Sequence, residues 1–249
     1  MTAATGFEQY AADGALVTGG GAAILLQLAD PVVGRAVAAH SAFAEDPMRR
    51  LRHTLSYVYA VGLGSPEQSA LVAGFVDRAH HGIPGAVDPE HQLWVAATLY
   101  AVGRDVHERL FAPLSAEFDA DVLAASARLG TSLQLPAAAW PADRAAFDRY
   151  WTDAVAGLQV TDDARAVARD LLHPRRVPPW VRIMMPLARA VTPTLLPEPV
   201  AAAYGFTPRP RRERLAWAWL RLLVRLAPRR IRSLPSRRLL ARLGSAPRG

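Results

Sequence analysis

The chain has 249 residues, of which 51% are hydrophobic, and its formal net charge is +7. This length and apolar content suffice for one large buried core, and the absence of cysteine excludes disulfide scaffolds, thiolate catalysis and cysteine-ligated zinc or iron–sulfur sites. The N-terminal residues MTAATGFEQYAADG have neither the basic nor the apolar region of an export signal, so we expect a soluble cytoplasmic protein.

Apolar residues recur at helical spacing through nearly the whole sequence, which predicts an all-α protein. In chain order we expect helices over residues 15–28, 31–43, 47–63, 66–82, 88–112, 119–135, 141–157, 161–173, 178–191, 194–203, 211–226 and 229–242. The stretch 93–100 is apolar on all sides and should lie in the middle of the bundle. Because no low-complexity stretch resembles a flexible linker, we expect a single irregular multi-helix domain.

Three of these helices begin at a proline that follows a capping side chain. Asp46-Pro47, Ser65-Pro66 and Asp88-Pro89 each place an acceptor before a residue whose missing N–H costs nothing in a first helical turn. The glycines and proline of Gly82-Ile83-Pro84-Gly85 predict a break between two helices. The helix that precedes this break ends on His80-His81.

The positive charge is concentrated at the C-terminal end of the chain. All 29 basic residues are arginine, and residues 205–249 hold 13 of them against one acid, Glu213, for a net charge of +12. The first 204 residues therefore carry a net charge of −5. We divide the chain into a helical domain, 1–204, and basic amphipathic helices, 205–249, which pack on that domain or lie on an anionic membrane surface.

Familiar nucleotide-binding and hydrolase motifs are absent from the sequence. It contains no G-x-x-x-x-G-K-[ST], no H-E-x-x-H and no G-x-S-x-G. The seven histidines stand at positions 40, 53, 80, 81, 91, 107 and 173, and no two of them are four residues apart on one helix face. A metal held by a single histidine would need a cofactor to supply its other ligands, and haem does so through four pyrrole nitrogens.

Three segments occur in an order and spacing typical of one family. They are Gly19-Gly20-Gly21 to Asp30-Pro31 with Ala39-His40-Ser41-Ala42-Phe43; Arg50-Leu51-Arg52-His53-Thr54 with Gly62; and His80-His81-Gly82-Ile83-Pro84-Gly85 followed by Asp88-Pro89-Glu90 and Leu93 to Thr98. Trp140-Pro141, Phe147 and Tyr150 continue the pattern. Over about residues 15 to 160 the chain resembles the MpaB/latex-clearing-protein family, the helical oxygenases that include bacterial rubber oxygenase.

The resemblance implies a globin-like helical core that binds haem b through an axial histidine. That ligand would be His80, which would bind the iron, and Arg50 and Thr54 would bind the haem beside it. His53, where rubber oxygenase has a lysine, would join Arg50 and Thr54 as a catalytic residue on the side that receives molecular oxygen. The implied activity is a haem-dependent oxygenase that acts on an apolar substrate in a helical pocket.

The sequence also departs from the family pattern at two positions. Asp30 and Ala96 stand where the family often has histidine, and no glutamate aligns with the base of the rubber-cleaving members. For His80 the alternatives are a helix C-terminal histidine favoured by the helix dipole or a packing role, and His81 is its rival as ligand. Arg50 and His53 could instead be solvated side chains of a helix surface, and Thr54 could pack in the core.

The basic C-terminal segment has an apolar stripe of its own. Leu215, Trp219, Leu222, Leu223 and Leu226 share one side of the helix predicted over 211–226. This stripe would cover part of the domain or lie on an anionic membrane; nucleic acid is not expected, since no binding fold is recognised and the rest of the chain is acidic. Besides an oxygenase, the sequence thus leaves open a non-catalytic binder of haem or a lipid-like molecule and a membrane-surface interaction protein.

Overall fold

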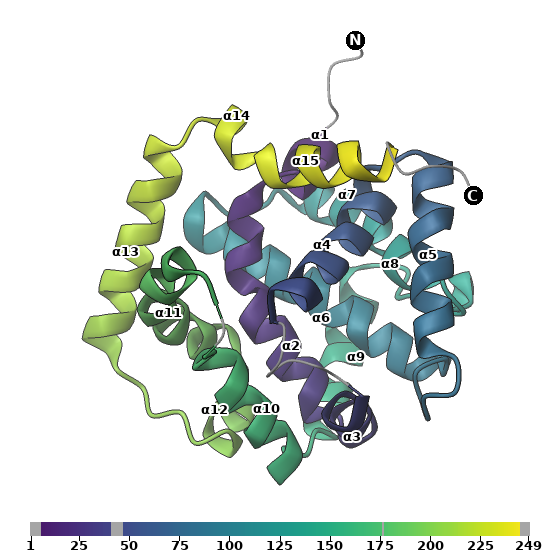
Figure 1. Cartoon of the computed structure of the whole chain (residues 1–249), viewed down its shortest axis with the longest axis horizontal. Coiled ribbons are helices and arrows are strands. Elements are labelled where there is room, and N and C mark those ends of the chain that lie inside the picture. The colour runs from purple at the N-terminus through teal and green to yellow at the C-terminus, as the bar shows by residue number, and fades with distance from the viewer. Residues whose placement is uncertain (1–5, 41–46, 176, 245–249) are drawn as a thin grey trace.

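The computed structural model describes residues 6–40, 47–175 and 177–244, and all the regular structure within these ranges is helical (Figure 1). The helices are α1 Gly6–Ala11, the 3-10 helix η1 Gly14–Gly19, α2 Gly20–Ala29, α3 Pro31–His40, α4 Pro47–Leu63, α5 Pro66–His80, α6 Pro89–Leu110, α7 Ala116–Ser126, α8 Arg128–Thr131, η2 Ala137–Ala139, α9 Arg144–Ala156, α10 Asp162–Leu172, α11 Pro179–Val191, η3 Thr192–Leu195, α12 Glu198–Ala203, α13 Pro210–Leu226, α14 Arg229–Arg232 and α15 Leu234–Gly244. The predicted all-α class is confirmed.

Helix starts follow the capping chemistry expected from the sequence. Ser65 forms a capping box with Gln68 ahead of α5, and the Asp88 carboxylate accepts the backbone N–H of Glu90 at the start of α6. Both helices have proline in their first turn, where its missing N–H is harmless. Helix α4 begins at Pro47 as predicted, whereas its proposed cap Asp46 and the predicted helical residues 41–43 lie outside the described residues.

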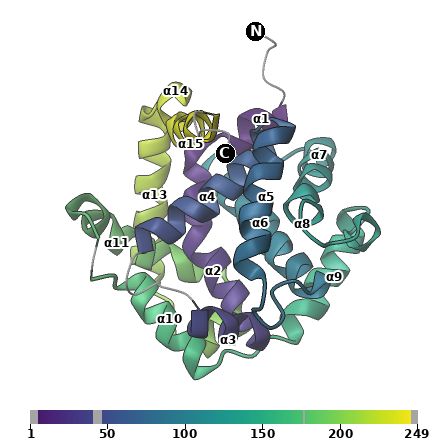
Figure 2. The same cartoon turned by 45° about the vertical axis from the view of Figure 1, so that its right-hand side comes forward.

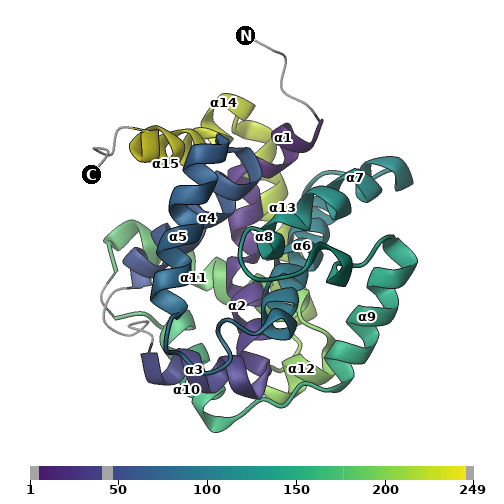
Figure 3. The same cartoon turned by 90° about the vertical axis from the view of Figure 1, so that its right-hand side faces the viewer.

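The centre of the molecule is the pair α2 and α6, which other helices surround (Figures 1 and 3). The α2 side chains Leu25 and Leu26 are fully buried in the largest apolar cluster, together with Trp94 of α6. The Trp94 indole N–H donates to the Leu26 carbonyl oxygen at 3.1 Å, so this buried polar atom is satisfied. The apolar stretch 93–100 is thus the middle of the bundle, as its composition predicted.

Two peripheral units matter for function. Helices α4 and α5 form an antiparallel hairpin, and α15 crosses them at the top of Figure 1, where Gln68 donates to the Leu240 carbonyl oxygen. At the left of Figure 1, α13 packs against α11 and α6. Ala216, Trp217 and Leu220 of α13 belong to the same apolar cluster as α2.

Several predicted boundaries were wrong. The helix predicted over 119–135 is two helices, α7 and α8, which are separated at Ala127, and α8 ends at Thr131. Beyond α8 the chain turns so that Leu135 packs on Gly130, where an added Cβ would lie 2.4 Å from Leu135 Cδ2. The helix predicted over 229–242 is divided into α14 and α15, and α1 was not expected. In the described residues no single helix is long and apolar enough to cross a membrane, although the sharply bent pair 14–29 and 31–39 meets the length and composition test.

Candidate functional site

The predicted site residues lie on α4 and α5, which turn at Gly64-Ser65 and run in roughly opposite directions, diverging away from the turn (Figures 2 and 3). Arg50 is near the start of α4 and His80 is the last residue of α5. The positive charge of Arg50 is still near enough to contribute to lowering the pKa of the His80 imidazole. Sequence reasoning named both residues.

His80 is half-buried, and its Nδ1 atom is shielded from solvent without a hydrogen-bond partner among the described residues. Burial lowers the pKa of His80 below its usual value, the Arg50 charge lowers it further, and Asp77 opposes the shift. The imidazole is thus kept neutral, the form that binds a metal. The neighbouring His81 is exposed and follows the last residue of α5, so the two adjacent histidines differ in their surroundings.

Arg50, His53 and Thr54 share one side of α4, since residues three and four apart are neighbours on a helix surface. All three side chains are exposed in the chain alone. Although Arg50 is exposed, the protein around its guanidinium partly removes water from it, and this desolvation lowers the pKa of Arg50. Tyr57 continues the same side of α4, and its hydroxyl donates to the Leu129 carbonyl oxygen at 2.7 Å.

The two departures from the family pattern have structural roles in this chain. The Asp30 carboxylate accepts the backbone N–H groups of Val32 and Val33 at 2.8 and 3.0 Å and so caps α3. Its second oxygen lies 3.4 Å from Nδ1 of His91. Ala96 is 1% exposed within a tightly packed apolar cluster, where a larger imidazole would displace its neighbours.

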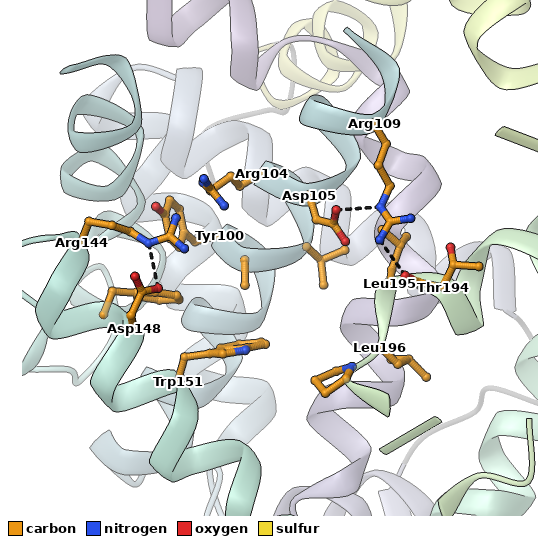
Figure 4. Close-up of a pocket in the computed structure, with 14 residues that line it drawn as sticks. Tyr100, Arg104, Asp105, Arg109, Arg144, Asp148, Trp151, Thr194, Leu195 and Leu196 are labelled. Carbon is orange, nitrogen blue, oxygen red and sulfur yellow. Dashed lines mark hydrogen bonds and ion pairs between the residues drawn. The ribbon is translucent and has the colours of Figure 1, made fainter. Parts of the chain in front are cut away.

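Sequence reasoning missed a polar pocket of about 260 Å³ between α6, α9 and η3 (Figure 4). In Figure 4, Arg144 and Asp148 face Tyr100 and Arg104 on one side of the pocket, and Asp105 pairs with Arg109 on the other. The pairs 105/109 and 144/148 are four residues apart and could have been found in the sequence as helix ion pairs.

Buried Asp119, next to this pocket, joins three helices. Its carboxylate accepts the Tyr100 hydroxyl at 2.8 Å, the Arg104 Nε at 3.0 Å and the Arg144 guanidinium at 3.1 Å. Burial, and then the bond to Asp119, raises the pKa of Tyr100. Since these arginines already have carboxylate partners, we interpret the network as one that holds α6, α7 and α9 together.

Within the described ranges, no group of three or more His, Asp or Glu side chains could hold a metal ion. A metal at His80 would thus not find three such ligands among the described side chains. Neither of the two cavities described, of about 260 and 330 Å³, is lined by Arg50, His53, Thr54 or His80.

Residues 8–228 match the family described as ER-bound oxygenase mpaB/B'/Rubber oxygenase, catalytic domain. The chain belongs to this family. The match covers the α4–α5 hairpin and extends to Pro228, beyond the end of α13.

Two mycobacterial proteins are similar to the chain along most of its length. They are the uncharacterized protein Mb2261 of Mycobacterium bovis and the uncharacterized protein Rv2237 of Mycobacterium tuberculosis, each 34% identical over 224 residues, which cover 83% of this chain and 88% of the relative. No solved structure matches the chain. The mpaB/rubber oxygenase assignment thus rests on sequence.

Proposed function

We propose that the protein is a haem-dependent oxygenase that acts on an apolar substrate, with His80 as the axial ligand of the iron. The observation that carries this proposal is the His80 Nδ1 atom, which is buried, has no hydrogen-bond partner among the described residues and belongs to an imidazole whose pKa is lowered. A buried nitrogen without a partner is costly, and a bond from Nδ1 itself to the iron would satisfy it. His91 and His107 also have such a nitrogen, so the choice of His80 among them rests on the family pattern. The chain's membership in an oxygenase family supports the same assignment.

The residues present fit haem b in their donor chemistry. A neutral histidine is a common axial ligand, and the absence of cysteine excludes the covalent attachment used for c-type haem. Arg50, whose charge acts on His80, has the five N–H donors that bind a carboxylate such as a haem propionate. When bound, haem would supply an iron that takes up and activates molecular oxygen.

The α4 side chains would serve binding and orientation. Arg50 would hold an anionic group by charge-assisted hydrogen bonds. The Thr54 hydroxyl offers one donor, and the His53 imidazole can donate from one ring nitrogen and accept a proton at the other. His53 thus takes the place of the family's lysine with a group that both gives and receives protons.

An absorbance spectrum of protein expressed with a haem precursor tests the proposal first, and oxygen uptake with an apolar alkene tests it second. We expect a Soret band and substrate-dependent oxygen consumption. Replacement of His53 by Gln should lower the turnover rate while the Soret absorbance per protein is kept. A colourless protein, or one that binds haem and reduces no oxygen with any apolar substrate tested, would contradict the oxygenase assignment.

A non-catalytic binder of haem or a lipid-like molecule is the second candidate. The observation that favours it is the structural use of Asp30 and Ala96, which cap α3 and fill the core where relatives often have histidine. This candidate predicts a Soret band or lipid retention without oxygen consumption. The two measurements above therefore separate the candidates.

A further inference from the structure

Helix α13 has two apolar faces, and only one of them packs on the domain. Ala216, Trp217 and Leu220 are buried, and the Trp217 indole N–H donates to the Thr194 hydroxyl at 3.0 Å. The other face carries the stripe recognised in the sequence, and it is exposed: Leu215 61%, Trp219 54%, Leu222 46%, Leu223 42% and Leu226 71%. The interpretation in which this stripe covers the body is wrong, because a different face of α13 does so.

Helix α11, which packs alongside α13, also exposes large apolar side chains (Figure 1). Trp180 is 60% exposed, Ile183 76% and Met184 41%. Exposed apolar groups gathered on neighbouring helices, unlike scattered single ones, mark an interaction surface. We call the exposed apolar residues of α11 and α13 the α11–α13 surface.

The charges around the α11–α13 surface are almost all positive. Helix α13 contains five arginines and one acid, Glu213, whose carboxylate accepts the backbone N–H of Arg209. At 100° per residue, Arg211 lies at the edge of the exposed stripe, and Arg214 and Arg225 lie about 60–80° beyond that edge, between the stripe and the buried face. A cavity of about 330 Å³ at the start of α13 adds Arg189 of α11 and Arg209.

We propose that the α11–α13 surface docks on an anionic lipid bilayer, with α13 lying in the plane of the membrane interface. An amphipathic helix binds there when leucine and tryptophan enter the boundary between headgroups and acyl chains while flanking arginines contact lipid phosphates. Exposed tryptophan, present at Trp180 and Trp219, favours this boundary.

Charge distinguishes this partner from a second copy of the chain. A symmetric dimer through this surface would bring the same patch of each subunit together. Each patch would contribute four of the five α13 arginines against one glutamate, since Arg221 faces the domain and donates to the Arg109 carbonyl oxygen, so the two copies would repel each other. An anionic bilayer has the opposite charge and accepts the apolar stripe as well.

Flotation of the full chain with vesicles tests the proposal, and it needs neither haem nor substrate. We expect binding to phosphatidylcholine vesicles that contain about one-third phosphatidylserine, weak binding to phosphatidylcholine alone, and a decrease with added salt. Tryptophan fluorescence should shift to shorter wavelength on binding as Trp219 leaves water.

Two sets of variants, each with its control, distinguish vesicle binding through the α11–α13 surface from non-specific binding. Trp219→Ser with Leu222→Ser should weaken binding about tenfold or more, whereas Leu71→Ser, at a similarly exposed leucine of α5, should not. Arg214→Gln with Arg225→Gln should weaken it roughly fivefold per arginine at low salt. The same exchange at the exposed Arg128 and Arg149 is the control for charge.

Three outcomes would overturn the proposal. The first is equal binding to neutral and anionic vesicles, and the second is anionic binding that survives the α13 variants. The third is no vesicle binding together with a solution dimer that Trp219→Ser and Leu222→Ser dissociate, which would assign the surface to a second copy. Unchanged melting temperatures of the variants, whose sites are exposed, would show that loss of binding is not loss of fold.

Discussion

Replacement of Gly85 by alanine should destabilise the protein through two separable effects. Gly85 lies between α5 and α6 with φ +77°, a conformation that costs an L-residue about 1–2 kcal/mol. An added Cβ would also lie 2.4 Å from Val32 Cγ1 of α3 and 3.2 Å from His91 Cδ2 of α6. Forcing an extra carbon into a packed site costs a further ~1–3 kcal/mol. We therefore expect a total loss of about 2–5 kcal/mol.

Gly82 is the matched control in the same loop. Its φ is +79°, almost the same as that of Gly85, but an added Cβ would meet nothing within 4 Å. Gly82→Ala should thus lose only the conformational part, about 1–2 kcal/mol. Thermal melting followed by circular dichroism should place Gly85→Ala several degrees below Gly82→Ala, since each kcal/mol shifts the midpoint by about 2–4 °C in a domain of this size. Equal midpoints for the two variants would refute the close contact between this loop and α3.

Two further predictions concern buried polar groups. Asp119→Ala should lower the free energy of unfolding in urea by about 2–4 kcal/mol, because it leaves Arg104, Arg144 and Tyr100 without their shared acceptor. Asp148→Ala, at an exposed carboxylate, should lower it by less than about 1 kcal/mol. Equal losses from the two variants would contradict the stabilising role of the Asp119 network. Burial lowers the pKa of His80 and of His107 in the folded chain, so the unfolded chain takes up protons first as the pH falls. The free energy of unfolding of the haem-free protein, measured in urea, should be constant above about pH 6.5 and should fall by up to about 1.4 kcal/mol per histidine per pH unit below it. His80→Gln should make this fall with pH less steep. An equally steep fall in the variant would contradict the lowered pKa of His80.

Much of the fold was predictable because its signals are local. The starts of α4, α5 and α6 follow from a proline in the first turn, preceded in α5 and α6 by a capping side chain. The end of α8 at Thr131, short of the predicted residue 135, was not predictable from local signals, because Leu135 meets Gly130 only after the chain has turned. Which face of α13 packs on the domain was also not predictable, because apolar residues lie on both of its faces and the sequence does not show which face is buried.

The candidate site shows the same limit. That Arg50 and His80 lie on two helices joined by a short turn was predictable from the sequence. The different surroundings of His80 and His81 were not, because α5 ends at His80 and the backbone of His81 is no longer helical. The network around Asp119 was missed because its partners Tyr100 and Arg144 lie 19 and 25 residues away, on helices that meet only in the folded chain.

Haem retention by single histidine variants tests the central claim most directly. Wild-type protein, His80→Ala and His81→Ala would be expressed with a haem precursor and purified in parallel, and the Soret absorbance per protein would be compared alongside the helical circular dichroism signal. Because the His80 Nδ1 atom is buried and unpaired while His81 is exposed, we predict that His80→Ala loses the band and that His81→Ala keeps most of it, with both folded. Equal loss from both variants, or full retention by a folded His80→Ala protein, would contradict His80 as the axial ligand.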